Sequence, residues 1–104
     1  MSVKEVKLKS EFKSCLNNND LVICDYGSLR CQPCKIMSPI FEKLSEKYLK
    51  VVFIKVDIDE LPTLADEQNI VLMPTFKIYI KGEEIDIVIG ADKSKLIKVC
   101  EKYF

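Results

Sequence analysis

Two apolar runs constrain the fold of this chain more than any other feature of its sequence. Residues 21–26 read LVICDY and residues 51–58 read VVFIKVDI, and both are largely continuous rather than alternating. Continuous apolar runs of this length are typical of strands buried on both faces of a sheet. Between them, residues 34–48 carry apolar residues at steps of three and four, which predicts a helix. A strand, a helix and a strand in this order predict two parallel strands.

The remaining segments extend this pattern along the chain. Residues 75–80 and 84–89 alternate between apolar and polar residues on either side of a Lys-Gly-Glu turn, which predicts an antiparallel hairpin. Residues 2–6 favour a short edge strand. Three further helices are predicted from polar residues that can cap a following apolar face, and these caps are Ser10, Asp59 and Asp92.

The predicted element order is β-α-β-α-β-α-β-β-α, which indicates the α/β class. We expect a central mixed, mostly parallel β-sheet flanked by helices on both faces. No repeat, low-complexity segment or linker divides the 104 residues. Residues 1–104 are therefore expected to form a single domain.

Composition excludes several classes of function. The 16 basic and 16 acidic residues balance, so nothing favours a nucleic acid or an anionic membrane as partner. The chain has no histidine, which excludes Ser-His-Asp and Cys-His hydrolases and Cys/His zinc fingers. The charged N-terminal residues do not resemble a secretory signal, and no apolar run is long enough to span a bilayer. We expect a soluble, cytoplasmic protein.

The segment SLRCQPCK contains the residues best suited to chemistry, Cys31 and Cys34. A predicted buried strand ends shortly before the pair and a predicted helix begins at it. Unpaired backbone N–H groups at a helix N-terminus stabilise negative charge, so Cys31 is expected to be the nucleophilic thiolate. A spacing of three residues lets the two sulfurs bond, with Cys34 as the resolving thiol. The pattern therefore favours a reversible redox disulfide.

Two other interpretations of this pair stay open at the level of the residues. The cysteines could be inert buried thiols, or they could be half of a metal site. A zinc site needs about four ligands, and the chain offers neither histidine nor a second CxxC, so we expect no metal. The three other cysteines, which lie on apolar segments and are expected to be core residues, are Cys15, Cys24 and Cys100. For Cys15 and Cys100 the alternative is glutathionylation or an intermolecular disulfide.

The segment VICDYGSLRCQPCKIMSPIFEKLSEKY resembles the active-site segment of the thioredoxin family, VDFWAxWCGPCK followed by a proline-containing helix. The match continues in FIKVDIDE, MPTFKIYIKGEE and VIGADKSKL, and covers essentially the whole chain. The resemblance implies a thioredoxin fold and a protein-disulfide oxidoreductase that carries electrons to protein disulfides. It implies reduction by a thioredoxin reductase or an equivalent donor with electrons from NADPH, and disulfide-containing proteins, peroxiredoxins among them, as substrates. No bound cofactor is expected, since the cysteine pair is itself the redox centre, and we expect a monomer.

The resemblance also implies roles for further residues. Asp25 matches the buried aspartate that assists proton transfer at Cys34, and Lys55 matches the lysine often found beside it. Even without the resemblance, a carboxylate that ends a buried strand is expected to have a raised pKa. Pro74 matches a cis-proline facing the disulfide, and Met73 would offer its backbone to an extended substrate segment. The remaining docking surface is matched by Ile58, Gly90 and Ala91.

The chain departs from the family pattern beside the cysteines. It contains no tryptophan; Gly27 and Arg30 stand where the family usually has two, and Gln32 replaces a glycine. Arg30 and Gln32 thus become candidate substrate contacts. We expect the positive charge of Arg30 to stabilise the Cys31 thiolate, to make the disulfide more oxidising and to favour acidic partners.

Three alternatives to a reductase-linked carrier remain. One is a glutathione-coupled or isomerase-like thiol exchanger. The second is a binding module that uses the thioredoxin surface without needing its thiols. The third is an iron–sulfur or zinc carrier in which Cys31 and Cys34 bridge two chains.

Overall fold

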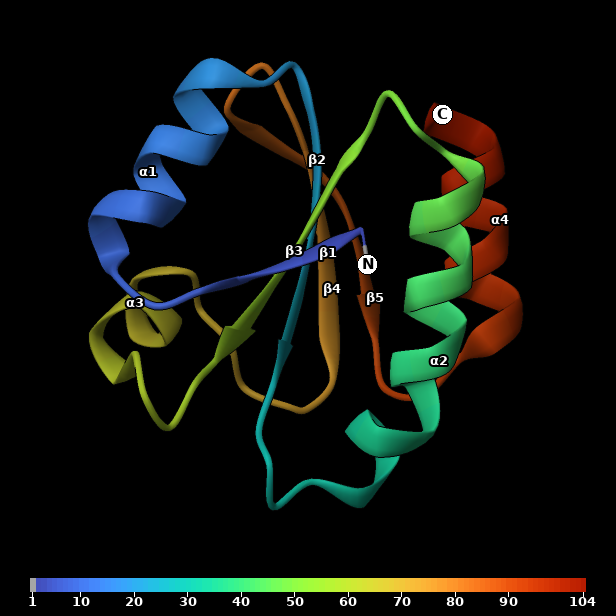
Figure 1. Cartoon of the computed structure of the whole chain (residues 1–104). Helices are drawn as coiled ribbons and strands as arrows, with labels where there is room; N and C mark the ends of the chain where they lie inside the picture. The colour runs from blue at the N-terminus through green and yellow to red at the C-terminus, as the bar shows by residue number, and fades with distance from the viewer. Residues whose placement is uncertain (1) are drawn as a thin grey trace.

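The computed structural model describes residues 2–104, which form one mixed sheet with helices on both faces (Figure 1). The strands are β1 (Val3–Val6), β2 (Leu21–Gly27), β3 (Val52–Asp57), β4 (Thr75–Ile80) and β5 (Glu83–Ile89). The helices are α1 (Lys9–Asn18), α2 (Gln32–Lys47), α3 (Pro62–Glu67) and α4 (Lys93–Tyr103). The sheet order is β1-β3-β2-β4-β5. The predicted order of elements and the fold class are confirmed.

The central strand β2 explains why its sequence is apolar throughout. It pairs in parallel with β3 and antiparallel with β4, so neither of its edges is free. Helices α2 and α4 cover one face of the sheet, and α1 and α3 cover the other (Figure 1). Successive residues of a strand point to opposite faces. Ile23 therefore packs under α2 and α4, whereas Val22 and Cys24 pack with Phe12 of α1.

The start of α1 differs from the prediction. The helix begins at Lys9, with Leu8 in the N-cap position, so the prediction that Ser10 caps it is wrong. The Glu11 carboxylate accepts the backbone N–H of Lys7 at 2.8 Å and that of Leu8 at 2.9 Å. This acidic side chain, three residues after the N-cap, thus binds the N–H groups of the N-cap residue and of the residue before it, which fixes the helix start at Lys9.

Of the other two predicted helix caps, one is confirmed and one is wrong. Asp92 caps α4, because its Oδ1 accepts the backbone N–H of Lys95 at 3.0 Å, as predicted. Asp59 does not cap α3, which begins at Pro62 with Leu61 in the N-cap position. The Asp59 carboxylate instead accepts hydrogen bonds from Ser28 and Arg30, which lie in the loop between β2 and α2. Within the described residues, no helix is both long and apolar enough to cross a bilayer.

Candidate functional site

Cys31 and Cys34 form a disulfide at the corner between β2 and α2, with their Cα atoms 5.3 Å apart. Cys31 is the N-cap residue of α2, and its Sγ accepts the backbone N–H of Cys34 at 3.2 Å. A hydrogen bond of this kind stabilises negative charge on the sulfur. The same sulfur lies at the positive end of the α2 dipole. The corner therefore favours a thiolate at Cys31 when the disulfide is reduced.

The chain reaches this corner through a tight turn. The Ser28 carbonyl accepts the backbone N–H of Cys31 at 3.2 Å, and β2 ends one residue earlier at Gly27. Pro33 lies in the first turn of α2, where its missing N–H leaves no hydrogen bond unmade. Local sequence thus builds the turn, the cap and the start of the helix together.

Asp25 is a buried carboxylate next to the disulfide. Its side chain is 1% exposed, and neither carboxylate oxygen has a hydrogen-bond partner among the described residues. Burial raises the pKa of Asp25 to about 7, while the charge of Lys55, its neighbour in the β2–β3 register, acts in the opposite direction. A Cβ added to Gly27 would lie 3.7 Å from Asp25 Oδ1 and 3.0 Å from Cys34 Sγ. The carboxylate and the Cys34 sulfur therefore border the same small space, and a group with a pKa near 7 can hold or release a proton there.

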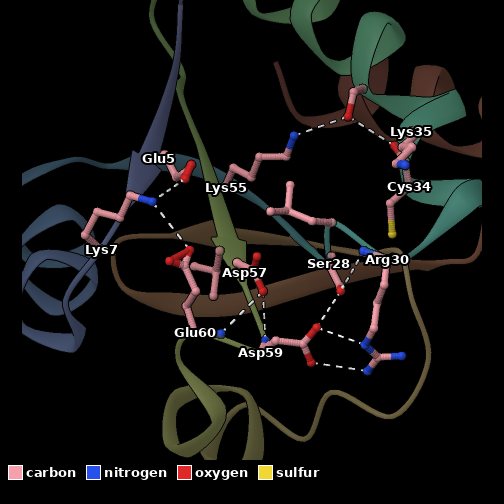
Figure 2. A pocket seen from close by; sticks show the side chains of 14 residues that line it. Glu5, Lys7, Ser28, Arg30, Cys34, Lys35, Lys55, Asp57, Asp59 and Glu60 are labelled. Atoms are coloured by element: carbon pink, nitrogen blue, oxygen red, sulfur yellow. Dashed lines mark hydrogen bonds and ion pairs between the residues drawn. The ribbon is translucent and has the colours of Figure 1, made fainter.

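Lys55 links the sheet to the active-site helix. Its half-buried Nζ donates a hydrogen bond to Ser38 Oγ at 3.2 Å. Ser38 Oγ in turn donates to the backbone carbonyl of Cys34 at 3.1 Å (Figure 2). This chain of contacts holds the amine near both Asp25 and Cys34. Sequence reasoning selected Lys55 but missed Ser38, because a serine inside a helix is usually a solvated or backbone-bonded residue.

The Met73–Pro74 peptide bond is cis. In the β2–β4 register Thr75 faces Tyr26, so Pro74 lies at the end of β2 occupied by Gly27. Gly90 donates its backbone N–H to the Pro74 carbonyl at 2.7 Å, and Ile58 donates to the Gly27 carbonyl at 2.9 Å. Strand register thus brings the predicted docking residues to the edge of the sheet that carries the disulfide, together with Met73 and Ala91.

Arg30 is placed differently from the expectation. Its Nε donates to Asp59 Oδ2 at 2.9 Å and its Nη2 donates to Asp59 Oδ1 at 3.2 Å, while Ser28 Oγ donates to the same carboxylate at 2.6 Å (Figure 2). The Arg30 guanidinium holds the pKa of Asp59 below its usual range. The charge of Arg30 is therefore paired with a carboxylate rather than free to act on Cys31. Gln32, the first residue of α2, is exposed beside the disulfide.

The three other cysteines lie in apolar surroundings. Cys24 and Cys100 are completely buried in the two cores on opposite faces of the sheet, and Cys15 is half-buried at the edge of one of them. Burial raises the pKa of each thiol, to about 12 for Cys100. They are packing residues, as predicted. Among residues 2–104, no three His, Cys, Asp or Glu side chains are grouped to hold a metal ion.

A pocket that sequence reasoning missed lies beside Cys34 (Figure 2). It has a volume of about 550 Å³, and Gly27, Cys34 and Lys55 line it together with residues of the Arg30–Asp59 pair. No residue pattern in the sequence predicts it, because its lining residues come from β1, the β2–α2 corner, β3 and the loop that follows β3.

The comparisons with known proteins agree with this geometry. The family model for thioredoxin matches residues 3–102. The chain is 45% identical over 101 residues to thioredoxin 1 of Plasmodium falciparum (isolate 3D7), with 97% of each chain covered. It is 43% identical over 96 residues to a thioredoxin of Equus caballus, covering 90% of this chain and 91% of the relative. A solved structure of Plasmodium falciparum thioredoxin matches with a TM-score of 0.95 at 44% identity, covering 97% of this chain and 99% of the other. The chain therefore belongs to the thioredoxin family, and its Cys31–Cys34 disulfide is the redox centre of a thiol–disulfide oxidoreductase.

Proposed function

We propose that this protein, acting as a single domain, carries electrons from a reductase to protein disulfides, with Cys31 as the attacking thiol and Cys34 as the resolving thiol. The observation that carries the proposal is the position of the disulfide at the N-terminus of α2, where the Cys31 sulfur accepts the Cys34 backbone N–H. This environment favours the thiolate at Cys31 over any other cysteine of the chain.

The reaction follows from the two sulfurs. The Cys31 thiolate attacks one sulfur of a substrate disulfide, which forms a mixed disulfide and releases the first substrate thiolate. Cys34 then attacks Cys31 Sγ, which closes the Cys31–Cys34 disulfide and releases the second substrate thiolate. Two electrons pass to the substrate, and the protein is left oxidised.

Cys34 must lose its proton before it attacks. Asp25 is the acceptor in this proposal, because its carboxylate borders the same space as the Cys34 sulfur and its pKa is near 7. Lys55 holds positive charge beside that carboxylate and is positioned by Ser38. Lys55 thus acts through Asp25 and not on the substrate. Its charge offsets part of the free-energy cost of ionising the Asp25 carboxylate.

The substrate surface surrounds the disulfide at one edge of the sheet. The backbone of Met73, before the cis bond to Pro74, is the proposed partner for an extended substrate segment. Exposed apolar side chains precede both the disulfide and the cis bond in the chain: Leu29, two residues before Cys31, is 83% exposed, and Val71, two residues before Met73, is 88% exposed. The remaining proposed contacts are Gln32, Ile58, Gly90, Ala91 and Arg30, the last with its charge paired to Asp59.

We propose a thioredoxin reductase using NADPH as the electron donor, and disulfide-containing proteins such as peroxiredoxins as acceptors. The protein would act as a monomer in the cytoplasm. It would need no bound cofactor, because the redox centre is made of its own two sulfurs. The family to which the chain belongs and the absence of any need for an external redox group support this assignment.

The test is NADPH oxidation in a mixture of this protein, a thioredoxin reductase and insulin. Turnover is expected with the unchanged protein and is expected to disappear in Cys31→Ser. Turnover that persists in Cys31→Ser would overturn the role of Cys31. Activity only with glutathione and glutathione reductase would replace the proposed donor by glutathione.

A further inference from the structure

Helices α2 and α4 lie side by side on one face of the sheet, and a shallow groove runs between them (Figure 1). The groove has a volume of about 370 Å³. Its floor is apolar and is formed by Pro39, Ile40, Leu44 and Ile97. Ile40 and Ile97 pack against the core below but stay half-exposed, so apolar surface remains open to solvent. The two active-site cysteines do not line the groove, which is therefore separate from the redox centre.

Three exposed lysines border this apolar floor, with Lys43 and Lys47 on α2 and Lys93 on α4. Among residues 2–104, none of the three forms an ion pair with a carboxylate. No acidic side chain of the described residues lines the groove. Farther along α4 the surface continues past Lys98 and Glu101, which contribute one charge of each sign. The groove is therefore positively charged on both sides and favours an occupant that carries carboxylates.

The charges of the chain are distributed unevenly, although they balance as a whole. Helices α2 and α4 together contain seven lysines and three glutamates, whereas the rest of the chain contains nine basic and thirteen acidic residues. Of the three glutamates, Glu42 and Glu46 lie outside the groove and its continuation along α4. The pocket beside Cys34, by contrast, is lined by four basic and four acidic residues and has no such preference. The α2–α4 groove is thus a basic region of a neutral molecule.

We propose that the α2–α4 groove is a docking site for a protein partner, and that it binds a segment whose apolar side chains are flanked by carboxylates. The apolar side chains of that segment would cover Ile40 and Ile97, in the manner of an amphipathic segment lying in a groove. Its carboxylates would pair with the lysines on either side. A partner held in this way leaves the disulfide free to react, because α2 carries the cysteines at its start and the groove farther along. The inference does not depend on the proposed function.

The shape of the groove favours a protein segment over a small amphiphile or a bilayer. A site for a small ligand usually buries most of the surface of that ligand. Here the two isoleucines of the floor are half-exposed, so an occupant must bring its own cover. A bilayer is bound by apolar side chains that protrude into it, often aromatic ones. No aromatic side chain of the described residues lines the groove, and its isoleucines lie between two helices.

The experiment uses the whole chain labelled with ¹⁵N and a synthetic peptide in which leucines spaced four residues apart are flanked by glutamates. A matched peptide carries glutamine in place of each glutamate. Titration with the acidic peptide is expected to shift the amide resonances of Ile40, Lys43, Lys93 and Ile97. At low salt the acidic peptide is expected to bind about tenfold more tightly than the glutamine peptide, since three surface ion pairs distinguish them. Vesicles containing phosphatidylserine are expected to leave these resonances unchanged.

Substitutions locate the binding in the groove. The double variant Lys43→Gln, Lys47→Gln is expected to weaken binding of the acidic peptide about fivefold and to leave the glutamine peptide unchanged. The matched control Lys4→Gln, Lys13→Gln removes the same charge from exposed lysines of β1 and α1, and is expected to change binding by less than about twofold. Ile97→Thr is expected to weaken both peptides, because it removes apolar surface from the floor.

Four results would overturn the inference. They are equal binding of the two peptides, equal losses in the two double variants, no binding of the acidic peptide at about 1 mM, and binding of the vesicles in place of the peptide. Insulin turnover with thioredoxin reductase is measured on the same variants and is expected to be unchanged. Absent turnover in the unchanged protein would refute the proposed function alone, because the peptide titrations do not involve the disulfide.

Discussion

Two groups of cysteines in this protein differ in chemistry although they are all at least half-buried. Cys24 and Cys100 are surrounded by apolar side chains, so burial raises the pKa of each thiol and keeps it protonated. Cys31 is only slightly more exposed, but its sulfur accepts a backbone N–H at the start of a helix. In the proposed function, this backbone hydrogen bond rather than exposure distinguishes the attacking thiol from the packing cysteines.

The largest effect is expected when substitutions in the two groups of cysteines are compared. Cys34→Ser is expected to lower insulin turnover by about 10³-fold or more, because the mixed disulfide can no longer be resolved. Cys24→Ala is expected to retain turnover and to lower the free energy of unfolding by about 1 kcal/mol, since it leaves only a small cavity. Coupled NADPH oxidation and urea unfolding measure the two effects. Comparable losses of turnover in both variants would contradict the distinction.

The Asp25 carboxylate belongs to the active site but lies in the apolar environment of the core. Its pKa is about 7 in the folded protein, against an ordinary value of about 3.8 in an unfolded chain. Between these values the native state holds a proton that the unfolded state has lost. Stability therefore falls as pH rises through this range, by up to about 4 kcal/mol above pH 7.

The variant Asp25→Asn removes this titration. Relative to the unchanged protein, its free energy of unfolding is expected to increase from about pH 4 to about pH 8 by up to about 4 kcal/mol. Denaturant unfolding of both proteins across this range measures the difference, and the remaining carboxylates cancel. Two stability curves that run parallel would show that Asp25 titrates near its ordinary value.

Alkylation of the reduced protein compares the reactivity of the two groups of cysteines without any substitution. Cys31 is expected to react with iodoacetamide about 100-fold faster than Cys24 or Cys100, which are reached only when the structure opens. The half-buried Cys15 should react at an intermediate rate. Mass spectrometry of timed samples gives all four rates in one experiment. Equal protection of Cys31 and Cys24 would be inconsistent with the proposed thiolate.

The smallest expected effect concerns Arg30. Because Asp59 neutralises its guanidinium, Arg30→Gln is expected to change the pKa of Cys31 by only a few tenths of a unit. Asp59→Asn frees the guanidinium and is expected to lower the pKa of Cys31 further, by less than about one unit. Thiolate absorbance during a pH titration measures both. A rise of more than about one unit in Arg30→Gln would restore the direct role that the sequence suggested.

The outcome for the predicted helix caps shows where sequence reasoning holds. Asp92 was predicted correctly because its hydrogen bond reaches a residue three positions away. Asp59 was assigned the same local role, but Arg30, twenty-nine positions earlier, binds it instead. Ser10 was displaced by Glu11, whose longer side chain reaches back to the preceding backbone. The residue that caps a helix can be predicted from the local sequence unless a charged side chain forms a stronger hydrogen bond instead.

The sequence alone determined the order of strands and helices and the site of the cysteine pair. Apolar periodicity follows directly from which faces are buried, and the contact between Cys31 and Cys34 needs only one turn of helix. Only the tertiary structure decided that Asp25 has no hydrogen-bond partner among residues 2–104, that Arg30 is neutralised and that Gly27 lies against the Cys34 sulfur. Desolvation and ion pairing depend on groups that the fold brings together from distant parts of the chain, so spacing along the sequence does not specify them.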